Sequence, residues 1–251
     1  IRGAFTGYGS AKGKAKDDRF EELYRNAKKS GLNVGAYYFS RATSYEEGKK
    51  EAEFLYNNCL KGKTFEYPIY MDVEDTVYQN KVSKNAINDA IRGFCEYIES
   101  VGGYVGVYCN LDWANNKMDY GKLSKKYDYW LAYWGNEMPR NTYGNYGMWQ
   151  YGGETNLIRG NTIAGKVVDQ NYSYKDYPSI MKYNKLNAWD DRNEVKEPEK
   201  TPITYIVKSG DNLSSIAEKY NTTWQKIYDD NKGIIGNNPN LIFKGQKLII
   251  K

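Results

Sequence analysis

The stretch YPIYMDVE, residues 67–74, decides the fold of this chain. Its apolar run is too short for a helix, has the length of a buried β-strand, and ends in acidic residues. Helical patterns lie on both sides: Ser44 and Glu47 form a capping-box pattern before one helix, and Ser83 opens another. Continuous apolar strands that alternate with amphipathic helices predict a parallel sheet covered on both faces.

Six further segments have the same strand character, and they are residues 1–8, 34–40, 104–110, 129–135, 147–152 and 166–171. A helix is expected after the first, with Asp17 or Asp18 as its N-cap and Gly31 at its end. The last two strands are joined by a loop. Seven strands are one fewer than the favoured closed α/β barrel contains.

The strand count leads to a prediction about the edges of the sheet. The chain opens at Ile1 in mid-strand, so we expect that a strand–helix unit of about forty residues precedes it in the complete barrel. Without that unit, strand 1–8 should not pair with strand 166–171. The structure should show a gap between them or another segment that fills it, and a chain lacking the unit should be weakly stable and nearly inactive.

Composition narrows the chemistry. The 251 residues contain no histidine, which excludes Ser-His-Asp and Cys-His catalytic sets and most zinc sites. The three cysteines, Cys59, Cys95 and Cys109, lack metal-ligand or disulfide spacing, and the last two fit core positions. No metal or organic cofactor is implied, and the chemistry must come from carboxylates, Tyr, Lys, Ser or Cys.

The net charge of +5 comes from interleaved basic and acidic residues, which argues against a nucleic-acid-binding tract. The excess suits an anionic surface such as a teichoic-acid-bearing wall, and it equally suits an ordinary soluble surface. No apolar run reaches membrane-spanning length, and no signal peptide is visible.

The composition changes near Asn187. Residues 190–200, DDRNEVKEPEK, are charged and poor in apolar residues, so they predict a flexible linker. Beyond the linker, the sequence has the pattern of a small complete βααβ unit. We therefore expect a large α/β domain over 1–186, a linker over 187–202, and a small α+β domain over 203–251.

Asp72 and Glu74 are the strongest candidates for chemistry. At positions i and i+2 of a strand their side chains point to one face, at the carboxyl end where barrel active sites lie. Two carboxyls this close repel, so one should keep its proton near neutral pH, and the longer Glu74 is the expected general acid. A solvated strand end is the alternative. Asp75 falls on the other face and is expected in a turn or helix cap.

Asp169 ends the last predicted strand and is a third candidate, with loop capping as the alternative. Four aromatic residues and one amide lie on or at the ends of predicted strands. We expect some of them to line a binding cleft, with core packing as the alternative, and they are Tyr37, Tyr108, Trp130, Trp149 and Gln150.

Short motifs in order along residues 1–186 resemble glycoside hydrolase family 25. They are Ile1-Arg2-Gly3, Gly7-Tyr8-Gly9, Gly35-Ala36-Tyr37-Tyr38-Phe39, Pro68-Ile69-Tyr70-Met71-Asp72-Val73-Glu74, Gly106-Val107-Tyr108, Trp130-Leu131-Ala132, Trp149-Gln150-Tyr151 and Val168-Asp169-Gln170-Asn171. The resemblance implies a modified (β/α) barrel of the family 25 lysozyme type, with Glu74 as proton donor and Asp169 in the active site. The family's opening strand, which bears an active-site aspartate, has no match here.

Residues 203–251 resemble the LysM domain. The matching residues are Tyr205-Ile206-Val207, Ser209-Gly210-Asp211-Asn212-Leu213, Ser215-Ile216-Ala217, Asn231, Asn238-Pro239-Asn240-Leu241-Ile242, Gly245-Gln246 and Leu248. LysM domains bind glycans that contain N-acetylglucosamine. The resemblance implies a groove with two walls, formed by Gly210, Asp211, Asn212 and Leu213 and by Asn240, Leu241, Ile242 and Phe243.

Together, the two resemblances imply a muramidase that cleaves the β-1,4 bond between N-acetylmuramic acid and N-acetylglucosamine in bacterial peptidoglycan. Its partner would be the glycan strand, and it would act on the wall after secretion or after phage-directed lysis. A wall-binding protein without catalysis, or another 2-acetamido-glycan hydrolase such as a chitinase, are the alternatives. The sequence does not distinguish an endolysin from an autolysin or a spore-associated enzyme, and it leaves the oligomeric state open.

Overall fold

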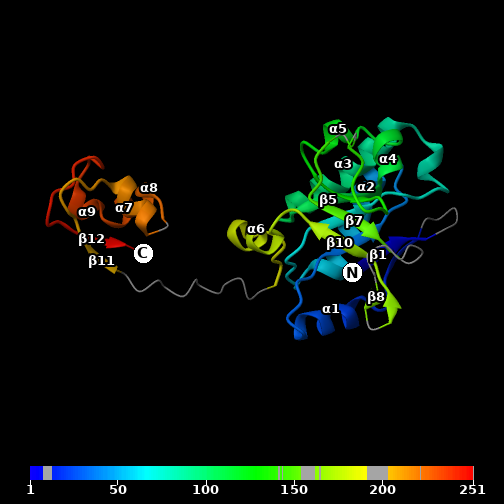
Figure 1. The fold of residues 1–251 in the computed structure, drawn as a ribbon, viewed down its shortest axis with the longest axis horizontal. Coiled ribbons are helices and arrows are strands. Elements are labelled where there is room, and N and C mark those ends of the chain that lie inside the picture. Colours follow the sequence, from blue (N-terminus) through cyan, green and yellow to red (C-terminus); the bar gives the residue numbers. More distant parts are fainter. Residues whose placement is uncertain are drawn as a thin grey trace. The chain divides into compact units, whose positions relative to one another are not determined.

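A computed structural model describes residues 1–7, 13–140, 142, 144–153, 162–163, 165–190, 203–220 and 222–250. The chain divides into two compact units, residues 1–191 and 192–251. Figure 1 shows a sheet with helices in the first unit, blue to yellow, and a smaller unit in orange and red. In the described ranges, no helix has both the length and the apolar character needed to cross a membrane.

The first unit is built on an eight-stranded sheet in the order β10-β7-β6-β5-β4-β3-β1-β2. Its strands are β1 (Arg2–Thr6), β2 (Lys14–Lys16), β3 (Ala36–Phe39), β4 (Ile69–Asp72), β5 (Val105–Asn110), β6 (Asp128–Ala132), β7 (Met148–Gly152) and β10 (Gln170–Ser173). The six central strands run parallel, and β2 and β10 pair antiparallel at the two ends. The predicted α/β class is confirmed.

Helices follow β2, β3, β4, β5 and β10, whereas no helix lies between β6 and β7 in the described residues. They are α1 (Phe20–Lys29), α2 (Tyr45–Leu55), the π-helical η1 (Tyr56–Leu60), the 3₁₀ turn η2 (Gln79–Lys81), α3 (Lys84–Ser100), α4 (Leu111–Asn116), α5 (Tyr120–Leu123) and α6 (Tyr177–Asn184). Ser44 and Ser83 cap α2 and α3 as predicted, because each side chain accepts a backbone N–H of the first turn. The cap expected at Asp17 or Asp18 of α1 is wrong: the N-cap is Arg19, and Asp17 accepts its backbone N–H.

Helices α2 and α3 pack side by side at unusually close range (Figure 1). A Cβ added to Gly48 of α2 would overlap the Ala90 carbonyl oxygen, and one added to Gly93 of α3 would overlap that of Tyr45. Two glycines that face each other's helix backbone therefore allow this approach. It holds α2 firmly in place against the sheet.

Alternation along the strands separates the two faces of the sheet. On β4, Ile69 and Met71 are fully buried in the main core together with α2 and α3. Tyr70 points to the opposite face, where it packs with Met148 of β7 and with Tyr177 of α6. Asp72 lies two residues after Tyr70, so its side chain is on the same face of β4. We call this face, which is opposite to the one that packs with α2 and α3, the inner face of the sheet.

The two ends of the sheet differ from the simple sequence pattern. Strand β1 does not pair with β10 in the described residues, as expected. The outer edge of β1 pairs with β2, which pairs with no other strand in the described ranges. The predicted strand 166–171 is two strands. Residues Lys166–Val167 form β9, which makes a hairpin with β8 (Thr162–Ile163), and β10 begins at Gln170. Asp169 therefore lies between strands.

The first unit extends past the boundary expected at residue 186. Asn187 is fully buried and bonds to the backbones of Tyr67 and Tyr104, and the Trp189 indole donates to the Val101 carbonyl. These residues belong to the first unit rather than to a linker. The rest of the expected linker, residues 191–202, lies outside the described residues.

The second unit has its own apolar core. Its elements are β11 (Ile203–Ile206), α7 (Leu213–Lys219), α8 (Trp224–Asp230), α9 (Lys232–Ile235) and β12 (Lys247–Ile250). The two strands pair antiparallel. The predicted βααβ order is present, with one additional short helix, α9.

Candidate active site

Asp72 and Glu74 lie at the carboxyl end of the central strand β4. Asp72 is its last residue and pairs in register with Phe39 of β3 and Tyr108 of β5. Glu74 follows two residues later. The intervening Val73 is fully buried on the helix side, so the two carboxyls point toward the inner face, as the sequence predicts.

One oxygen of the buried Asp72 carboxyl is unsatisfied. The exposed fraction of Asp72 is 5%, and its Oδ1 has no hydrogen-bond partner among the described residues. Burial, and then the charge of Glu74, raise the pKa of Asp72 well above its usual range. Burial, and then the charge of Asp169, raise the pKa of Glu74. The pair therefore retains a proton at pH values where exposed carboxyls have lost theirs, and it titrates as a unit.

Asp169 is close enough to this pair for its charge to raise the pKa of Glu74. Its charge also raises the pKa of Tyr108, although burial and the charges of Glu74 and Asp72 contribute more. A Cβ built on Gly153 would lie 2.6 Å from Asp169 Oδ1 and 2.5 Å from the Trp134 ring. Gly153 thus allows Asp169 and Trp134 to come together beside the end of β7.

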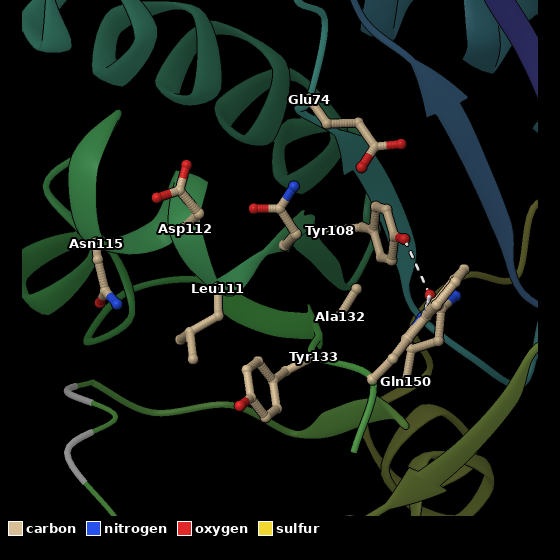
Figure 2. A pocket seen from close by; sticks show the side chains of 10 residues that line it. Glu74, Tyr108, Leu111, Asp112, Asn115, Ala132, Tyr133 and Gln150 are labelled. Atoms are coloured by element: carbon tan, nitrogen blue, oxygen red, sulfur yellow. Dashed lines mark hydrogen bonds between the residues drawn. The ribbon is translucent and has the colours of Figure 1, made fainter. Parts of the chain in front are cut away.

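A cavity of about 670 Å³ opens beside Glu74 at the carboxyl ends of β4 to β7. Its lining residues are Glu74, Tyr108, Asn110, Leu111, Asp112, Asn115, Ala132, Tyr133, Trp134 and Gln150. Figure 2 shows Glu74, Tyr108 and Gln150 on one side, and Asp112 and Asn115 of α4 on the other. The volume is in the range of ligand-binding clefts, and the lining combines aromatic rings with amides.

Gln150 organises one wall of the cavity. Its Oε1 accepts from the Tyr108 hydroxyl at 3.2 Å and from the Trp134 indole N–H at 3.0 Å. The amide itself is buried, whereas the Trp134 ring is 37% exposed. A buried amide therefore holds an exposed indole at the mouth of the cavity, where it can stack against a sugar ring.

The structure brings only part of the predicted cleft together. Tyr108 and Gln150 line the cavity. Tyr37 and Trp130 lie on the inner face but further from the carboxyl ends of the strands. They line a separate cavity of about 380 Å³. Trp149 has the opposite strand parity, is buried, and packs on Tyr172.

Sequence reasoning missed the residues at the end of β5, in α4 and directly after β6, which form much of the wall. They are Asn110, Leu111, Asp112, Asn115, Tyr133 and Trp134. The available signal was their position, because all of them lie at or just after the carboxyl end of a predicted strand.

Comparison with known proteins agrees with this geometry. Residues 8–159 match the sequence model of glycosyl hydrolases family 25. The chain belongs to glycosyl hydrolases family 25. Residues 205–251 match the LysM domain, so the second unit carries a LysM domain.

Two kinds of relatives define the family 25 domain further. The autolytic lysozyme of Clostridium acetobutylicum is 29% identical over 146 residues, which cover 57% of this chain and 42% of that protein. The crystal structure of the CTP1L endolysin matches with a TM-score of 0.57 and 22% identity, over 72% of this chain and 59% of that one. The muramidase of Acremonium alcalophilum matches with a TM-score of 0.55 and 20% identity, over 72% and 85%. The chain thus spans less than two thirds of the first two proteins, and the solved structures establish the fold.

Asp75, next to the acidic pair of the family 25 domain, has two roles. Its Oδ2 accepts the Tyr78 N–H at 2.6 Å, which is the expected turn contact. Its Oδ1 accepts Arg41 Nε at 2.9 Å in an ion pair that is almost fully buried. No local sequence pattern predicts this ion pair, since Arg41 lies 34 residues away.

In the LysM domain, a cavity of about 500 Å³ is lined by Asn212, Leu213, Ser214, Trp224, Pro239, Asn240 and Ile242. Four predicted wall residues are therefore present: Asn212, Leu213, Asn240 and Ile242. Gly210, Asp211, Leu241 and Phe243 do not line it. Asp211 instead accepts from the Tyr205 hydroxyl and the Lys208 N–H, and Trp224 is an additional aromatic wall residue that the sequence analysis did not single out.

Proposed function

We propose that this chain is an N-acetylmuramidase, which hydrolyses the β-1,4 bond between N-acetylmuramic acid and N-acetylglucosamine. The observation that carries the proposal is the acidic pair: a half-buried Glu74 that lines the cavity and has a raised pKa, next to a buried Asp72 whose Oδ1 lacks a partner. Family 25 membership and the LysM domain support a peptidoglycan substrate.

Glu74 is the proposed general acid. Its raised pKa keeps the proton that the leaving glycosidic oxygen must receive as the bond to the anomeric carbon breaks. After departure of the leaving group, the Glu74 carboxylate takes a proton from the attacking water. One residue thus acts as acid and then as base.

Asp72 is proposed to receive the substrate's 2-acetamido N–H on its free Oδ1. This bond stabilises the ionised form of Asp72, which leaves the shared proton on Glu74. It also directs the acetamido carbonyl oxygen toward the anomeric carbon, where it can act as an internal nucleophile. Asp169, across the site, would stabilise the positive charge that develops on the sugar.

The LysM domain is proposed to hold the enzyme on the wall through N-acetylglucosamine units bound in its 500 Å³ cavity. Amide side chains of Asn212 and Asn240 suit the acetamido groups, and Trp224 suits a sugar face. Such a substrate lies outside the cytoplasm, so the enzyme must reach it by export or by release at lysis.

Reducing-end analysis tests the proposed bond. Purified peptidoglycan is digested with the chain, reduced with borohydride, and the terminal sugar alcohols are identified by mass spectrometry. Reduced N-acetylmuramic acid is the expected product. Reduced N-acetylglucosamine would identify a different glycan hydrolase, and the absence of new ends would favour a binding protein without catalysis.

A further inference from the structure

A second cluster of buried polar side chains lies directly behind the acidic pair. Its members come from β1, from the loop after β3, from α2, and from the loop and the 3₁₀ turn η2 that follow β4. They are Thr6, Ser40, Arg41, Glu51, Asp75 and Gln79, and each is at most 4% exposed. The proposed mechanism uses none of these side chains.

One half of this buried cluster holds the backbone on the far side of Glu74. The Asp75 N–H, which follows Glu74 directly, donates to Gln79 Oε1 at 3.1 Å. The Asp75 carboxylate is in turn fixed by Arg41. The backbone directly after Glu74 is therefore anchored through both the amide and the side chain of Asp75.

The other half holds the backbone at Asp72. The Ser40 N–H donates to the Asp72 carbonyl oxygen at 3.0 Å. The Ser40 hydroxyl accepts from Gln79 Nε2 at 3.3 Å and donates to Glu51 Oε2 at 2.5 Å. Ser40 therefore connects the strand end, the Gln79 turn and Glu51 in one hydrogen-bond chain.

Glu51 is surrounded by donors. Its Oε1 accepts from Thr6 Oγ1 at 2.6 Å and from the Arg41 N–H at 3.1 Å, and its Oε2 accepts from Ser40. This arrangement fits a carboxylate, which only accepts. The three donors are uncharged groups, and burial outweighs them, so the pKa of Glu51 rises to about 7.

Other titratable groups face Glu51 from each neighbouring element. Tyr38 of β3 bonds to Thr6, and Glu47 lies on the same helix. A cavity of about 140 Å³ places Lys14, Lys50 and the Arg41 side chain near Glu51 as well.

We propose that Glu51 is a positioning residue for Glu74, and that its ionised form fixes the strand end through Ser40 and Gln79. Protonation of Oε2 makes Glu51 a hydrogen-bond donor to the Ser40 hydroxyl. The hydrogen of that hydroxyl then loses Glu51 as its acceptor, and it competes with the N–H that Gln79 donates to Ser40. The chain from Glu51 to Asp72 and Asp75 loosens as a result. This inference rests on the proposed role of Glu74 as the general acid.

The variant Glu51→Gln tests the inference, because the amide keeps the size of the side chain and donates to Ser40 as a protonated Glu51 would. On soluble peptidoglycan fragments, kcat should equal that of wild type at pH 5 and be about tenfold lower at pH 8, with KM within about twofold. Glu53→Gln, the same change at an exposed position of α2, is the matched control and should show a ratio near one at both pH values.

Ser40→Ala cuts the chain while the Glu51 side chain itself is kept, with the loss of one of its three hydrogen bonds, and it keeps the test usable if Glu51→Gln folds poorly. It should lower kcat at pH 8 to the same level, and the double variant should be no slower than either single one. The positioning role would be overturned if the losses of kcat in the two single variants multiplied in the double variant. It would also be overturned if the ratio of variant kcat to wild-type kcat stayed constant from pH 5 to pH 8.

A second measurement does not depend on turnover. The ¹³C carboxyl resonance of Glu74 should show an inflection near pH 7 in wild type that is absent in Glu51→Gln. Lack of turnover by wild type would refute the proposed function, while the Glu74 titration would still decide the inference. A Glu74 titration that is identical in both proteins would refute the inference alone.

Discussion

Asp72 and Glu51 are both buried carboxyls, and burial raises the pKa of each, yet their surroundings differ. One oxygen of Asp72 has no hydrogen-bond partner among the described residues, whereas Glu51 accepts three hydrogen bonds. A buried polar atom without a partner destabilises the folded state, and a ligand that supplies the missing bond is one reason for a structure to retain it. The difference supports the two proposed roles, in which Asp72 contacts the substrate and Glu51 maintains the geometry around it.

The largest effect is expected at Glu74. Glu74→Gln should lower the rate of peptidoglycan hydrolysis by about 10²–10⁴-fold, because the amide cannot give a proton to the leaving oxygen. Circular dichroism should remain that of wild type, and the Tm at neutral pH should be no lower than that of wild type, because the pKa of Glu74 is raised in the folded state. Glu53→Gln is the matched control, and retention of more than about half of the activity by Glu74→Gln would exclude it as the acid.

Asp72→Asn should reduce kcat by about 10²-fold, because the amide no longer directs the acetamido group as a carboxylate does. It should also stabilise the protein. The pKa of Asp72 is raised in the folded state, so its contribution to stability is present at acid pH and lost as pH rises through the folded-state pKa. The Tm of Asp72→Asn should therefore exceed that of wild type by a margin that grows from pH 4 to pH 8. A margin that is constant with pH would contradict the assignment of a buried, titrating Asp72.

The LysM domain offers the same contrast on a smaller scale. Trp224 lines the cavity, so Trp224→Ala in residues 203–251 should weaken binding of N-acetylglucosamine oligomers about tenfold while the Tm changes little. Asp211 makes bonds within the fold, so Asp211→Asn should lower the Tm by several degrees and leave affinity unchanged. Calorimetric titration and thermal melts check both, and an affinity loss in Asp211→Asn alone would reverse the two roles.

The smallest effect is expected at Tyr108. Its hydroxyl donates to Gln150, which also holds Trp134, so Tyr108→Phe removes one of two bonds to the amide. KM should rise about threefold with kcat nearly unchanged, in proportion to one neutral hydrogen bond. Steady-state kinetics on soluble fragments can detect this. A drop in kcat as large as that of Asp72→Asn would place Tyr108 in the chemistry itself.

The sequence was informative where a short-range pattern of apolar residues determines the local structure. The apolar run before Asp72 predicted the strand, and its parity predicted that Asp72 and Glu74 share a face. Strand β2 was missed because KAK has no apolar pattern and is held by pairing with β1. The division of 166–171 was missed for a similar reason, since the β8–β9 hairpin depends on a local turn rather than on burial.

The buried network could not be predicted from sequence. Glu51 lies in an amphipathic helix where a glutamate ordinarily faces solvent, and its partners Thr6 and Ser40 are 45 and 11 residues away. Local pattern contains no information about such distant pairing. The same limit applies to Asn187, whose burial depends on the backbones of Tyr67 and Tyr104.

The close crossing of α2 and α3 has a consequence for engineering. Replacing a helical glycine by alanine is a common way to stabilise a protein, because it restricts the unfolded chain. At Gly48 and Gly93 the extra methyl would meet the carbonyl of the opposite helix and push the two helices apart. Since Glu51 lies one turn beyond Gly48, directed evolution toward heat resistance would meet a conflict here between thermal tolerance and activity, and libraries should leave both glycines unchanged.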